Sequence, residues 1–206
     1  YEKAVIAPTM MVFFDWSALH CSNAGTFGEA YRKLEPAAIW DMDKRTSWNT
    51  HYKAIYLTNF LHENQFRFKN ISQERIDFWL AQADFVKALM YFRLAQDWGE
   101  AVVAPSTEDA SQQAKSPINT ILTEAIQAAE AALILPTFDK LTNAQGNNIN
   151  SRQYASLGTV HTLLANIYAW MGGLYDKEEY WKKAEASASL VIEGKVGFYD
   201  LVSMKD

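Results

Sequence analysis

Three tryptophans near the start of the chain are the side chains best suited to binding a ligand. Trp16, Trp40 and Trp48 lie in or beside a region without strong helical periodicity. Their sequence neighbours carry carboxylate, guanidinium and amide groups: Asp15, Asp41, Asp43, Arg45 and Asn49. An indole ring stacks on the apolar C–H face of a pyranose, while charged and amide groups bond to its hydroxyls. The pattern indicates a sugar-binding site formed by Trp16, Trp40, Asp43, Arg45 and Trp48.

Burial in the protein core is the alternative for each of these tryptophans, because Trp is highly buried on average. Trp48 is the most ambiguous of the three, since it also opens the apolar stripe of the first expected helix. An indole ring that faces solvent beside a carboxylate would support a role in stacking on a sugar, and full burial of the ring would exclude that role.

Catalytic and metal-binding patterns are not found in the sequence, so we expect a protein that is not an enzyme and holds no cofactor or metal. His62 is followed by Glu63 but has no second histidine four positions on, as a zinc protease needs. Asp41 and Asp43 form too small a set for a Ca²⁺ loop. The single cysteine, Cys21, forms no intrachain disulfide. His161 stands in an apolar segment and is expected to be a packing residue.

Composition and periodicity predict that long helices position these residues. The chain has 206 residues, of which 49% are hydrophobic and 21% are charged, as in a globular protein. Only nine glycines and five prolines are present, too few for the frequent turns of a sandwich or barrel. The net charge of −5 gives no basic face for nucleic acid. The most apolar stretch, residues 4–14, is shorter than a membrane-spanning helix.

Five helices are expected, at about residues 46–62, 72–98, 116–136, 151–171 and 177–193. Ser72 is the expected N-cap of the second helix and Ser116, before Pro117, that of the third. Glycines 172 and 173 are expected to end the fourth helix. Residues 101–103 are predicted to form a short extended segment. The fold class is therefore all-α, an α-α superhelix of divergent tetratricopeptide-like hairpins after an irregular N-terminal segment.

The residues of these helices resemble motifs of the SusD/RagB family. Trp48-x3-Tyr52-x2-Ile55-x3-Asn59 resembles the family's W-x3-Y-x2-I-x3-N helix. Residues 82–92, QADFVKALMYF, are similar to its EAxFLRALxYF segment, and residues 98–102, WGEAV, to the FGDVP that follows. Further matches in the family order are Glu130-Ala131, Leu135-Pro136, Arg152, Gly158, Leu163-Leu164-Ala165, Tyr168, Trp181-x2-Ala184, Val191-Ile192 and Phe198-Tyr199-x-Leu201.

The resemblance implies a non-catalytic nutrient-binding protein of the outer membrane, displayed on the cell surface through a lipid anchor. Such proteins cap a SusC-type TonB-dependent transporter and capture glycans, or in RagB-like members peptides. A protein–protein interaction module built from helical repeats is the alternative function. An enzyme on the same scaffold is the third hypothesis.

Family members are usually more than twice as long as this chain. We therefore expect residues 1–206 to form a single SusD-like N-terminal tetratricopeptide-type domain, a fragment of a longer protein. The lipid-carrying N-terminal cysteine of the family is absent from this chain, since Cys21 lies inside the expected folded region. Ligand residues are not carried over from the family, because the matched motifs belong to its scaffold. Asn59 is accordingly expected to bond inside the fold, since an unpaired buried amide costs about 1–3 kcal/mol.

Overall fold

The computed structural model describes residues 48–109, 111–143, 145–149 and 153–200. The chain divides into two compact units, Tyr1–Ala54 and Ile55–Asp206. The described part of the first unit is residues 48–54, which include the start of helix α5 (Asn49–Glu63). The remainder of α5 and all later elements belong to the second unit.

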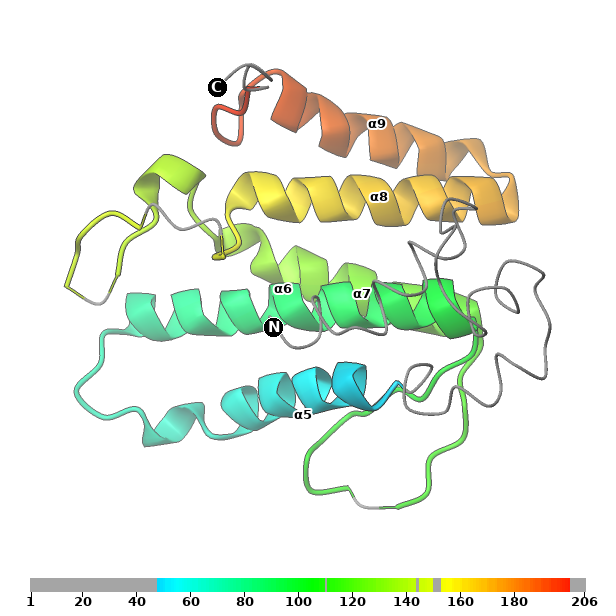
Figure 1. Cartoon of the computed structure of the whole chain (residues 1–206), viewed down its shortest axis with the longest axis horizontal. Helices are drawn as coiled ribbons and strands as arrows, with labels where there is room; N and C mark the ends of the chain where they lie inside the picture. Colours follow the sequence, from blue (N-terminus) through cyan, green and yellow to red (C-terminus); the bar gives the residue numbers. More distant parts are fainter. Residues whose placement is uncertain (1–47, 110, 144, 150–152, 201–206) are drawn as a thin grey trace, which may run out of the picture. The chain divides into compact units, whose positions relative to one another are not determined.

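The second unit is built from antiparallel helices joined in hairpins (Figure 1). The main helices after α5 are α6 (Gln73–Trp98), α7 (Ile118–Ala131), α8 (Leu157–Tyr175) and α9 (Glu178–Ile192). Three single-turn 3-10 helices connect them: η1 (Gln65–Arg67), η2 (Ala132–Ile134) and η3 (Phe138–Lys140). Helix α6 packs on α7, and α8 packs on α9 and on α7. No strand occurs among the described residues, and the predicted all-α class of helical hairpins is confirmed.

The core lies between α6, α7 and α8. Met90, Tyr91 and Leu94 of α6 are fully buried, as are Ile121 and Leu122 of α7, the helix on which α6 packs. Alanines fill much of the rest of α7, and their small side chains let the two helices approach closely. Burial of this apolar surface supplies most of the favourable free energy of folding, at about 25 cal/mol per Å².

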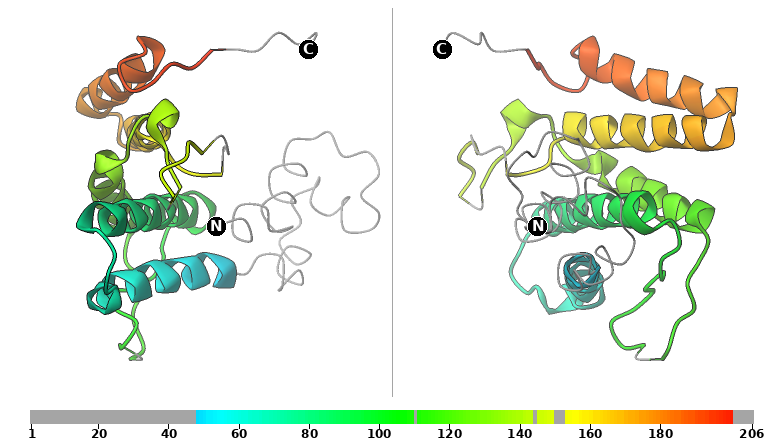
Figure 2. Two further views of the ribbon diagram at one scale, coloured as in Figure 1. Left: turned by 90° about the vertical axis from the view of Figure 1, so that its left-hand side faces the viewer. Right: turned by 45° about the vertical axis from the view of Figure 1, so that its right-hand side comes forward.

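Helices α8 and α9 lie side by side as a hairpin (Figure 2), and two glycines of α8 make close contacts with aromatic rings. A Cβ atom at Gly172 would lie 2.7 Å from the indole of Trp181, so the ring packs directly on the α8 backbone. A Cβ at Gly158 would lie 2.4 Å from the ring of Tyr199. The Tyr199 hydroxyl bonds to Ser156 Oγ at 2.8 Å and so joins the end of the described chain to the start of α8.

Several predicted helix ends are correct and others are wrong. Ser72 caps α6 as predicted, since its side chain accepts a bond from the Arg75 N–H. Ser116 does not cap α7, because its backbone pairs with Ala101 in an isolated antiparallel bridge and Pro117 takes the N-cap position. That bridge is the short extended piece expected near residues 101–103.

Helix α8 begins later and ends later than predicted. It starts after Ser156, which forms a capping box with Thr159. It continues through both glycines to Tyr175 and ends at Asp176, which has a left-handed conformation with φ of 50°. The expected stop at residues 172–173 was wrong because Gly172 serves the contact with Trp181. Within the described residues, no helix combines the length and apolar character that a membrane span requires.

Candidate functional site

Of the five residues predicted to bind sugar, the structure describes Trp48. Trp16, Trp40, Asp43 and Arg45 lie outside the described residues, as do Asp41 and Cys21. Trp48 precedes α5 and is half-buried. Its ring meets that of Tyr52 edge-on, with centroids 5.6 Å apart and planes at 87°. This packing holds the indole in place while leaving part of it exposed, so both interpretations of Trp48 stay open.

The polar residues of α5 hold the connection between α6 and α7. Asn59, only 5% exposed, donates from Nδ2 to the carbonyl of Ala104 at 2.8 Å. Its Oδ1 accepts from the ammonium of Lys87 on α6 at 2.9 Å. The predicted role of Asn59 inside the fold is therefore confirmed. The hydroxyl of Tyr91 accepts from the Ala104 N–H at 3.0 Å and adds a second tie to the same residue.

Glu63, at the end of α5, fixes the next stretch of this connection. Its Oε1 accepts from Ser106 Oγ at 2.8 Å and from the Thr107 N–H at 2.9 Å, and its Oε2 accepts from the Thr107 hydroxyl. The hydrogen bond from the Thr107 side chain is the largest influence lowering the pKa of this carboxyl. Residues 104–107 are thus ordered against α5 by side chains one helical turn apart.

His62 and His161 lie on α5 and α8. His62 Nε2 lies 2.7 Å from Asp84 Oδ1 and links α5 to α6. His161 is half-buried on α8, and burial lowers its pKa. In the part of the chain that the structure describes, no three His, Cys, Asp or Glu side chains come together in a way that could hold a metal ion.

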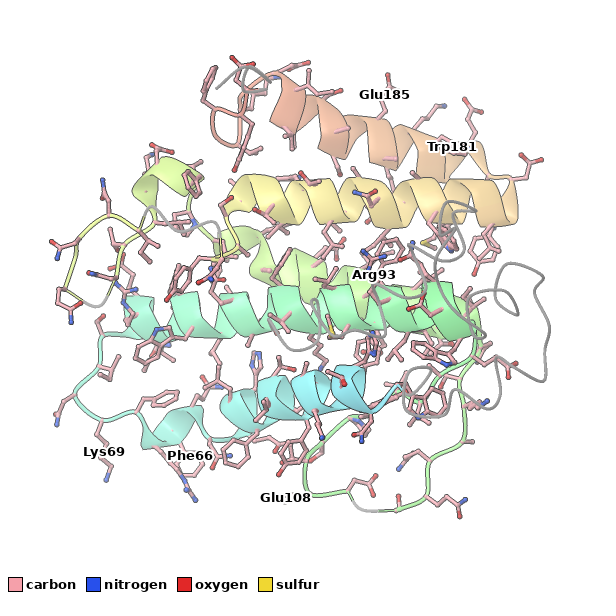
Figure 3. The ribbon with its side chains drawn as sticks, viewed as in Figure 1. Phe66, Lys69, Arg93, Glu108, Trp181 and Glu185 are labelled. Carbon is pink, nitrogen blue, oxygen red and sulfur yellow. The ribbon has the colours of Figure 1, made fainter. Side chains whose placement is uncertain are left out.

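Two surface recesses are formed by described residues of the second unit. One, of about 1030 Å³, lies between the start of α6 and residues 134–146 and includes Arg75, Trp79 and Lys140 in its lining. The other, of about 410 Å³, lies between α8 and α9 beside Trp181 and Glu185, which Figure 3 labels on α9. Sequence reasoning missed both. The sequence signal for the first recess was Trp79, an aromatic residue of the expected helix at 72–98 to which no role was assigned.

Comparison with known proteins identifies the family. The family model SusD-like_3, described as starch-binding and associating with outer membrane, matches residues 20–143, which is more than half of the chain. The chain belongs to this SusD-like family. A search of curated proteins gave no match.

Solved SusD-like structures share the helical fold. A SusD superfamily protein from Parabacteroides distasonis aligns with a TM-score of 0.72 and 19% identity, over 89% of this chain and 38% of its own. A SusD homolog from Bacteroides thetaiotaomicron aligns with a TM-score of 0.67 and 21% identity, over 81% and 31%. A laminarin-binding SusD-like protein aligns with a TM-score of 0.60 and 19% identity, over 75% and 32%.

At these identities the likeness establishes the fold alone. The chain spans only about a third of the length of the solved SusD-like proteins that it matches. Among the family-motif residues, Asn59, Lys87 and Tyr91 are occupied in fixing the α6–α7 connection.

Proposed function

We propose that this SusD-like protein captures oligosaccharides at the cell surface without chemical conversion. The observation that carries the proposal is the family-model match over residues 20–143, a family described as starch-binding and associating with outer membrane. The laminarin-binding protein among the matched structures supports a glycan as the ligand class. RagB-like peptide binding is the competing ligand class.

The proposed binding site is the one that the sequence predicts, with Trp16, Trp40 and Trp48 as stacking surfaces and Asp43 and Arg45 as hydrogen-bonding groups. The edge-on contact with Tyr52 supports this role for Trp48, because a ring already held in place loses little freedom on binding. Capture then consists of stacking and hydrogen bonding, with no bond made or broken in the ligand.

Calorimetric titration of the full chain with maltohexaose, laminarihexaose and penta-alanine tests the ligand class. We expect one of the hexasaccharides to bind, and Trp40→Ala and Trp48→Ala each to weaken binding about tenfold, since each removes an aromatic contact. Phe66→Ala is the matched control, because Phe66 is 73% exposed on η1. Binding of penta-alanine alone would refute the saccharide assignment in favour of the peptide one.

We further propose that the protein works with a SusC-type TonB-dependent transporter and is held at the outer membrane by a lipid anchor. The family description supports an outer-membrane association. Co-purification of a large β-barrel protein with the full-length protein from native membranes is the expected result. Recovery of the protein free of any barrel protein, under conditions that keep known SusC–SusD pairs together, would contradict the partnership.

A further inference from the structure

The recess at the start of α6 is formed entirely within the second unit of the chain. It lies between the turn that precedes α6 and the stretch that follows α7, and its volume is about 1030 Å³. Figure 1 shows the start of α6 and the loop at 141–149 on the same side of the hairpin array. Ligand pockets in proteins typically measure about 300–1,000 Å³, so the recess has room for several sugar rings.

The wall formed by the 141–149 loop is fixed in place by Arg75. The guanidinium donates from Nη1 to the carbonyl of Thr142 at 2.9 Å and from Nη2 to the carbonyl of Asn143. The same guanidinium lies 5.2 Å from the centre of the Phe78 ring. The loop also closes on itself, since the Ile149 N–H donates to the Leu141 carbonyl at 2.8 Å. The recess therefore exists before any ligand arrives.

The aromatic surface of the recess comes from Phe78 and Trp79 of α6. Trp79 is half-buried, and the ring of Phe68 meets it edge-on at 5.6 Å and 71°. An indole held by a neighbouring ring and still partly exposed is the kind of surface on which the C–H face of a pyranose stacks. Its orientation does not have to be fixed on binding, which lowers the entropic cost.

The polar groups of the recess supply both donors and acceptors. Glu74 is exposed and Asp77 accepts from Gln73 Nε2 at 2.7 Å, while Lys140 stands exposed across the recess. With Arg75, the recess holds two cations and two carboxylates, so their formal charges cancel. A phosphorylated or sulfated ligand would need a cationic excess. Hydroxyl groups, which donate and accept, suit this mixed and neutral set.

We propose that this recess is a second saccharide-binding site, which takes a neutral oligosaccharide and is formed by other residues than the predicted N-terminal site. Trp79 is its stacking surface, Glu74 and Lys140 bond to sugar hydroxyls, and Arg75 is a positioning residue that acts through the 141–149 loop. The proposal rests on the proposed glycan-binding function but uses different residues, so the two are separable by mutation.

Calorimetric titration of the full chain tests the second site. The probes are the neutral maltohexaose, laminarihexaose and xylohexaose, the acidic hexagalacturonate, and penta-alanine. We expect a neutral hexasaccharide to bind in an event that survives Trp48→Ala and is weakened at least about tenfold by Trp79→Ala, which removes the stacking surface. Glu74→Gln should weaken it several-fold.

Matched controls keep the test specific. Phe66→Ala removes an exposed aromatic ring that points away from α6 (Figure 3), and Glu179→Gln removes a first-turn carboxylate of α9; neither should change the affinity. Circular dichroism verifies that Trp79→Ala folds, and the surface substitution Glu74→Gln tests the recess if it does not.

Three results would overturn the proposal in different ways. If Trp48→Ala abolishes all hexasaccharide binding while Trp79→Ala and Glu74→Gln leave it intact, the recess is not a sugar site and the proposed function stands. If no hexasaccharide binds, both proposals fall. If the recess variants weaken only hexagalacturonate or penta-alanine binding, the recess binds a different ligand class.

Discussion

Replacing Asn59 with alanine should lower the free energy of unfolding by about 2–4 kcal/mol. The substitution removes the donor to the Ala104 carbonyl and the acceptor for the Lys87 ammonium. A buried carbonyl left without a partner costs about 1–3 kcal/mol, and a hydrogen bond to a charged group contributes about 1.5–3 kcal/mol. Both partners are only partly buried, so water replaces some of each bond and the sum falls below the upper limits.

Urea unfolding of the full chain, followed by circular dichroism, measures this loss, and a double-mutant cycle locates it. Lys87→Met alone leaves Asn59 Oδ1 without its donor, so the double variant should lose about 1–2 kcal/mol less than the two single losses added together. Asn166→Ala is the control, because Asn166 is exposed on α8, and it should change stability by no more than about 0.5 kcal/mol. A loss below about 0.5 kcal/mol for Asn59→Ala, or strict additivity in the cycle, would refute the assigned network.

Three other substitutions test separate features. Gly172→Ala should destabilise the chain by about 1–3 kcal/mol in thermal unfolding, because its Cβ would lie 2.7 Å from the Trp181 indole, and an unchanged Tm would exclude that contact. Burial raises the pKa of Asp97, so folding favours the protonated acid over the carboxylate. Asp97→Asn should therefore increase the free energy of unfolding at pH 7, and this increase should vanish below about pH 4, where the acid is protonated in both states. An increase that persists at pH 3 would refute burial of the carboxylate as the cause. Glu63→Gln should speed hydrogen exchange at the Thr107 amide, and unchanged exchange would show that the carboxylate does not hold it.

Sequence reasoning located the helices because their signals are local. The Ser72 N-cap and the apolar periodicity of α6 are set by residues within a few positions of one another, and both are present in the structure. The start of α7 and the end of α8 depend on partners in other elements of the fold. The backbone of Ser116 pairs with Ala101, so Ser116 does not cap α7 as its residue type predicts. Gly172 lies against the Trp181 ring inside α8, so it does not end that helix as its residue type predicts.

The candidate sites were less predictable than the fold for a related reason. The prediction for Trp48 used only its chemical type and its neighbours in sequence, whereas its exposure depends on packing. The recess at α6 combines Trp79 with Lys140, residues some 60 positions apart that no single motif contains. The hydrogen bond from Arg75 to the Thr142 carbonyl joins the start of α6 to the loop after α7. An arginine and a threonine this far apart in sequence form no recognisable motif.

The same physics explains why this family can be identified from a short chain while its ligands vary. Ile55 and Asn59, two positions of the motif that revealed the family, are both buried. Both ends of the Asn59 amide are hydrogen-bonded, to Ala104 and to Lys87. A substitution of Asn59 therefore lowers stability whatever the ligand is. Residues such as Glu74 and Lys140 are exposed and carry no such constraint, so their identity can follow the ligand. At Ile55 and Asn59 the motif therefore specifies the scaffold, whereas its first position, Trp48, stays partly exposed and is a ligand contact in the proposed function.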